Sequence, residues 1–127
     1  MRKYNFNIIT SFIFLIPATL SFYNKIYWHF LIILASATLS VLYHFAKQKK
    51  FKESDKILAI ALMVSNLYLL YLSGFIFVYT ILVMLFIAFG FYFLHKARIS
   101  KYPLNHPIWH LCSIMITILC ILAYSKI

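Results

Sequence analysis

Two pairs of polar residues in this sequence share a spacing that places each pair on one face of a helix. Ser40 and His44 are four residues apart, and so are His106 and His110. Residues i and i+4 of an α-helix are neighbours on its surface. Both pairs stand near the ends of long apolar segments, as does Asp55. Ionisable side chains in such segments are costly and tend to serve a function.

These residue types suit a metal-dependent hydrolytic site. The neutral imidazoles of His44, His106 and His110, with a fourth position open for water, form the ligand set of a catalytic zinc ion. Zinc lowers the pKa of bound water to about 7, which makes hydroxide available at neutral pH. Asp55 could then accept the proton of that water or orient a ligand. Ser40 could hydrogen-bond the water or a developing oxyanion.

The composition of the chain excludes an ordinary soluble domain. Its 127 residues are 65% hydrophobic and 11% charged, whereas soluble domains are roughly 45–50% apolar and 25% charged. A domain of this size has too little interior to hide so many apolar side chains, but lipid accepts them on the outer surfaces of helices. The net charge is +10, yet the basic residues form no stripe interleaved with aromatic residues. We therefore expect no nucleic-acid binding.

The apolar segments predict an all-α fold, a polytopic membrane bundle of about five transmembrane helices in one domain, residues 1–127. Helices are expected because lipid cannot satisfy open backbone groups, and the alternation typical of membrane strands is absent. A tight turn is expected at Ser73 and Gly74. The first segment resembles a signal peptide but lacks a clear A-x-A cleavage site, so we expect it to be retained. The predicted spans are residues 6–23, 26–46, 57–73, 75–94 and 107–124.

The basic residues predict how these spans are oriented. With five spans, the N-terminus and segments 47–56 and 95–105 emerge on one face of the membrane, and the C-terminus on the other. Lys25 and Lys126 lie on the C-terminal face, and the positive-inside rule makes the opposite face cytoplasmic. The candidate site residues from three segments then share the cytoplasmic interface. The basic residues of that face are Arg2, Lys3, Lys47, Lys49, Lys50, Lys52, Lys56, Lys96, Arg98 and Lys101.

The candidate residues also have simpler interpretations. Histidines at a membrane interface often share water with lipid headgroups, which is the role that we expect for His29 and His95. Asp55 could cap the start of its helix, with Ser54 as the competing cap. Ser40 could be a small residue at a helix contact. The shared interface and the repeated spacing favour the functional interpretation.

At these positions the sequence resembles the CREST superfamily of membrane hydrolases and receptors, which includes alkaline ceramidases and the progestin and adipoQ receptors. The family pattern stands here as Ser40-Val-Leu-Tyr-His44, Asp55 and His106-Pro-Ile-Trp-His110. The step of eleven residues from His44 to Asp55 is similar to that of alkaline ceramidases. The resemblance implies three histidine ligands to zinc, with Asp55 and Ser40 contacting the metal-bound water. The family core has seven helices, so a homo-oligomer of this shorter chain could complete a lipid pocket.

The expected function is a zinc-dependent integral membrane hydrolase that cleaves an amide or ester bond in a membrane lipid. An amide bond follows from the ceramidase resemblance alone. The alternative is a non-enzymatic membrane protein, receptor-like or a complex subunit, with a structural zinc site. A proton or metal transporter is weaker, because no charged residue lies near the middle of a predicted span. An open coordination position facing a lipid-accessible cavity would distinguish the hydrolase from the non-enzymatic protein.

Overall fold

A computed structural model of the chain describes residues 3–46, 49–99 and 105–126. Within these ranges every regular element is an α-helix, which confirms the all-α bundle. The helices are α1 (Lys3–Ile13), α2 (Leu15–Tyr23), α3 (Tyr27–Ala46), α4 (Lys49–Leu72), α5 (Phe77–Ile99) and α6 (Asn105–Tyr124).

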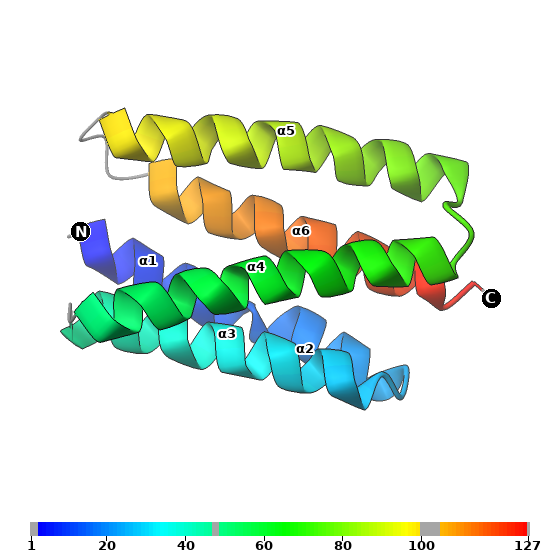
Figure 1. The fold of residues 1–127 in the computed structure, drawn as a ribbon, viewed down its shortest axis with the longest axis horizontal. Coiled ribbons are helices and arrows are strands. Elements are labelled where there is room, and N and C mark those ends of the chain that lie inside the picture. Colours follow the sequence, from blue (N-terminus) through cyan, green and yellow to red (C-terminus); the bar gives the residue numbers. More distant parts are fainter. Residues whose placement is uncertain (1–2, 47–48, 100–104, 127) are drawn as a thin grey trace.

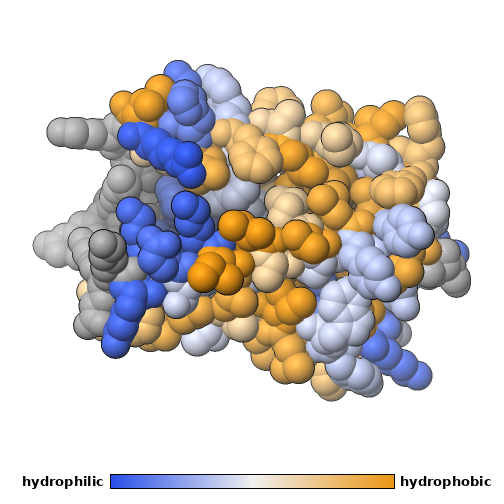
Figure 2. All heavy atoms as spheres, viewed as in Figure 1, coloured by the Kyte–Doolittle hydropathy of each residue, from blue (hydrophilic) through white to orange (hydrophobic). Residues whose placement is uncertain are grey.

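Helices α3 to α6 are each long and apolar enough to cross a membrane, and residues 8–23 of α1 and α2 form a shorter apolar segment. Large apolar side chains cover the outside of the bundle; Phe77 on α5, for example, is 75% exposed. Figure 2 shows a broad hydrophobic surface along the middle of the molecule, with most of the strongly hydrophilic residues at one end and a few at the other. A surface of this kind needs a lipid environment, so the helices indicate a multi-pass membrane protein.

Successive long helices run in opposite directions (Figure 1). The N-terminal helix begins at the end of the bundle where α3 ends, α4 begins, α5 ends and α6 begins, and the C-terminus lies at the opposite end. This path brings the predicted site residues to one end of the bundle. They are Ser40, His44, Asp55, His106 and His110.

The first apolar segment is bent at Phe14, where α1 ends and α2 begins. Pro17 causes the bend, because it has no N–H to donate to the carbonyl of Ile13 and its ring crowds that carbonyl. At the bend, the Phe14 N–H donates to the carbonyl of Ser11, three residues earlier, at 3.3 Å. Both halves still pack against α3 and α6. Thr10 and Ser11, near the end of α1, are buried inside the bundle.

Helix α6 lies at the centre of the bundle and contacts α1, α2, α4 and α5. Ile116, Cys120 and Ile121 have no exposed surface. The contact with α5 depends on Gly90, because a Cβ atom there would lie 3.0 Å from the Trp109 ring. A larger residue at position 90 would push α5 away from the helix that carries two of the histidines.

The structure differs from the predicted spans mainly at the start of α4. This helix begins at Lys49, eight residues before the predicted start at residue 57, because its charged first turns continue the helix beyond the apolar segment. Asp55 and Ser54 consequently lie in the second turn of α4, and Ser54 donates a hydrogen bond to the Lys50 carbonyl at 3.0 Å. The capping interpretation of both residues is wrong. The predicted turn after α4 is confirmed, with Gly74 at φ 77°.

Candidate metal site

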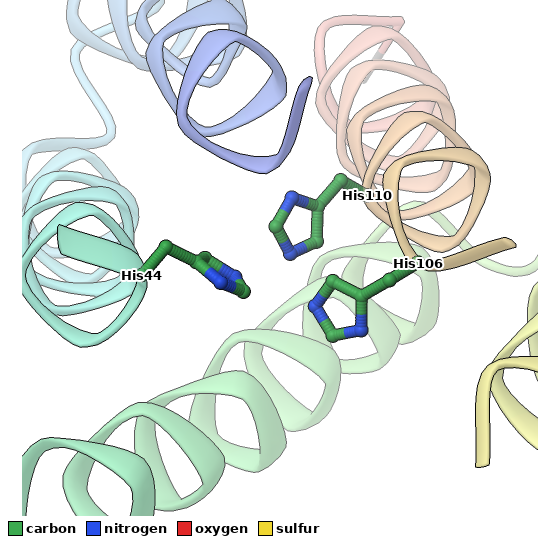
Figure 3. Close-up of side chains that lie close together, drawn as sticks. All are labelled: His44, His106 and His110. Carbon is green, nitrogen blue, oxygen red and sulfur yellow. The ribbon is translucent and has the colours of Figure 1, made fainter. Parts of the chain in front are cut away.

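Three histidines from two helices meet at one end of the bundle. His44 lies in the last turn of α3, and His106 and His110 lie in the first two turns of α6. Figure 3 shows their imidazole rings pointing toward one another. The ring centroids are separated by 5.1 Å for His44 and His106, 5.5 Å for His44 and His110, and 4.6 Å within the α6 pair. The fold brings together the histidines that were selected by their spacing.

The donor atoms of this cluster fit a metal ion. One ring nitrogen from each histidine lies within 4.8 Å of the others. Two ligands of a tetrahedral zinc ion, each at ~2.0–2.1 Å from the metal, are roughly 3.4 Å apart. Small side-chain rotations would close the difference. His44 and His110 are buried, and His106 is half-buried, so the nitrogens converge in a sheltered position.

Thr10 of α1 holds one ring of the cluster. Its Oγ1 lies 2.8 Å from Nδ1 of His110, and both residues are buried. A metal-ligating histidine usually donates its second ring N–H to an oxygen, which selects the tautomer and the ring orientation. Thr10 is therefore placed to receive Nδ1–H and leave Nε2 of His110 to the metal. The His110 ring also makes a T-shaped contact with the Phe14 ring, with centroids 6.2 Å apart.

Ser40 lies one turn before His44 and is also bonded to α1. Its Oγ is 2.7 Å from Oγ of Ser11, and both side chains are buried. The interpretation of Ser40 as only a small packing residue is therefore incomplete. The sequence reasoning missed Thr10 and Ser11; the available signal was a pair of adjacent hydroxyl residues inside an apolar segment.

A cavity of about 70 Å³ opens beside the histidines, between α3, α4, α6 and the bend after α1. His106 and His110 line it together with Ser40 and Asp55. One water molecule needs about 10–15 Å³ of such space, so the cavity has room for a few waters. The two residues predicted to act on a metal-bound water thus face the same space as two of the predicted ligands.

His29 does not have the interfacial role that we expected. Its side chain has no exposed surface. Its Nε2–H donates to Oδ1 of Asn66 at 2.8 Å, and its Nδ1 lies 3.0 Å from the Ser21 hydroxyl. Asn66 also donates to the hydroxyl of Thr117 at 3.0 Å. The packing of α2 and α4 around this face of α3 provides polar partners that replace interfacial water.

This second network joins α2, α3, α4 and α6, and it touches the metal cavity, because Asn66 lines that cavity as well. His29 itself is not part of the histidine cluster. His95, by contrast, is exposed near the end of α5, as expected of an interfacial residue. The two histidines that looked alike in the sequence therefore have different environments.

Comparison of the chain with protein-family models, curated proteins and solved structures finds no match. The resemblance to the CREST superfamily therefore depends on the five motif residues.

Proposed function

We propose that the protein is a zinc-dependent membrane hydrolase that cleaves an amide or ester bond in a lipid. One observation carries the proposal, namely that the histidine cluster adjoins a cavity whose wall contains Ser40 and Asp55. Structural zinc sites are usually closed by four protein ligands, whereas catalytic sites have three and an open position. Among the described residues, the cluster contains three histidines and no cysteine or carboxylate.

Bound zinc would supply Lewis acidity and a nucleophile at neutral pH. The carboxylate of Asp55 would accept a proton from the attacking water while the water oxygen bonds to the carbonyl carbon of the substrate. Ser11 can donate to Ser40, which leaves the Ser40 proton to hydrogen-bond the carbonyl oxygen as negative charge develops. When the C–N or C–O bond breaks, Asp55 returns the proton to the leaving nitrogen or oxygen.

The distribution of basic residues supports a cytoplasmic position for this site. By their order in the sequence, ten of the twelve Lys and Arg residues are predicted to belong to the membrane face where the histidines lie. Arg2, Lys47 and Lys101 of that group lie outside the described residues. Lys25, between α2 and α3, and Lys126, after α6, belong to the opposite face. This orientation gives the hydrolase access to lipids of the inner leaflet.

The test is a measurement of metal content and hydrolysis on the same detergent-purified protein. We expect about one zinc per chain and hydrolysis of an amide or ester lipid in a screen of both classes. His106→Ala should lose both properties. A protein that binds zinc but hydrolyses no lipid would favour the non-enzymatic alternative, in which the metal only ties α3 to α6.

A further inference from the structure

A second cavity lies on the outside of the bundle, between α1, α2 and α3. This groove has a volume of about 230 Å³. Phe12 and Leu15 form one wall, and Leu34, Ala37 and Val41 of α3 form the other. No charged side chain lines the groove. Its apolar walls belong to segments that lie in the membrane, so its natural occupant is hydrocarbon.

The groove runs along α3, in the direction that an acyl chain has in a bilayer. Its lining on α3 extends from Leu34 to Leu42, which is a rise of roughly 12 Å along the helix axis at ~1.5 Å per residue. It therefore runs from the middle of α3 toward the end that carries His44. An acyl chain lies in a bilayer in the same way, with its polar end at the interface and its methylene groups toward the centre.

A pair of hydroxyl groups stands between this groove and the metal cavity. Ser11 lines the groove, Ser40 lines the metal cavity, and their Oγ atoms are 2.7 Å apart. The polar group of a lipid in the groove would meet these hydroxyls before it met the histidines. The apolar groove and the polar metal cavity therefore meet at Ser11 and Ser40.

We propose that the groove between α1 and α3 binds the acyl chain of the substrate, and that its carbonyl reaches the metal cavity past Ser11 and Ser40. The substrate class is then a lipid with a hydrocarbon chain next to the scissile amide or ester bond. The assignment of the carbonyl rests on the proposed hydrolase function, whereas binding of the chain can be measured without it.

The test uses the full chain in phosphatidylcholine vesicles and a long-chain fatty acid that carries a diazirine on its chain. After illumination, mass spectrometry should find adducts on groove residues, and excess unlabelled long-chain fatty acid should suppress them. Thr38→Trp fills the groove from an exposed position on α3. This variant should reduce groove labelling by roughly tenfold, the lower end of what a misfit in an apolar pocket costs.

Leu31→Trp is the matched control, because Leu31 lies seven residues from Thr38 on the same face of α3, is 63% exposed and does not line the groove. Its labelling should equal that of the parent. His106→Ala should also keep the groove labelling, which separates chain binding from zinc chemistry. Labelling spread evenly over the lipid-facing surfaces of α3, α4 and α5, or equal labelling in both Trp variants, would overturn the inference. Groove labelling in a protein without hydrolytic activity would support the acyl-chain binding site and contradict the proposed hydrolase function.

Discussion

Thr10 and His110 are one hundred residues apart in the sequence and are joined by a buried contact of 2.8 Å between Oγ1 and Nδ1. This contact attaches the first apolar segment to the histidine cluster. Helix α1 therefore belongs to the candidate site, although the residue types in α1 do not indicate this in the sequence.

The first prediction concerns this contact. Thr10→Val keeps the side-chain shape but removes the oxygen that orients His110, so zinc affinity should fall by roughly 10–100-fold. Thr10→Ser retains the hydroxyl and should stay close to the parent. Thr19→Val is a control, because Thr19 is exposed on α2, where its hydroxyl donates to the Leu15 carbonyl. Competition with a chromogenic chelator measures the affinity, and an unchanged value in Thr10→Val would contradict the orienting role.

The second prediction concerns the ligands. His44→Ala and His106→Ala each remove one of three nitrogen donors, so purified protein should lose most of its bound zinc. Inductively coupled plasma mass spectrometry gives the number of zinc ions per chain, after dialysis of the protein against a low concentration of chelator. Retention of the parent zinc content in both variants would show that the metal binds elsewhere.

The third prediction separates His29 from the cluster. His29→Ala should keep the zinc stoichiometry, because His29 bonds to Ser21 and Asn66 and not to the other histidines. It should lower thermal stability, since a buried amide oxygen that loses its donor costs roughly 1–3 kcal/mol. Melting in detergent, followed by intrinsic fluorescence, measures this loss. Zinc depletion in His29→Ala at unchanged melting temperature would place His29 in the metal site.

The fourth prediction concerns chemistry. Asp55→Asn should reduce lipid hydrolysis by about 10²–10⁴-fold with zinc content unchanged, because general acid–base assistance is worth that much. Ser40→Ala should reduce it less. Glu53→Gln removes an exposed charge from the same helix outside the cavity and should leave hydrolysis unaltered. Full activity of Asp55→Asn together with a lowered melting temperature would assign Asp55 a structural role.

The fifth prediction concerns orientation. We expect the C-terminus to lie outside the cytoplasm, because the positive-inside rule predicts a cytoplasmic histidine end of the bundle and α6 ends at the opposite end. An alkaline phosphatase fusion and a green fluorescent protein fusion after Ile127 give opposite signals and check each other. A fluorescent C-terminus would reverse the orientation of the whole bundle.

Much of this architecture could be predicted from local features of the sequence. The length of each apolar segment predicted a helix, because a hydrocarbon layer of fixed thickness limits each span. Gly74 predicted the turn between α4 and α5, because a positive φ favours glycine. Alternating helix direction then assigned His44 and His106 to one end of the bundle. The i, i+4 spacing added His110 to the face of His106.

The tertiary structure decided which side of each helix faces inward. An apolar membrane helix carries similar side chains on all faces, so its sequence contains little information on rotation about its axis. His29 was for this reason expected at an interface, although packing of α2 and α4 buries it against Asn66. Thr10 and Ser11 likewise became site residues only when the bend at Phe14 laid α1 against α3 and α6. Hydropathy measures transfer into lipid, whereas a hydrogen bond between helices depends on where two particular side chains meet.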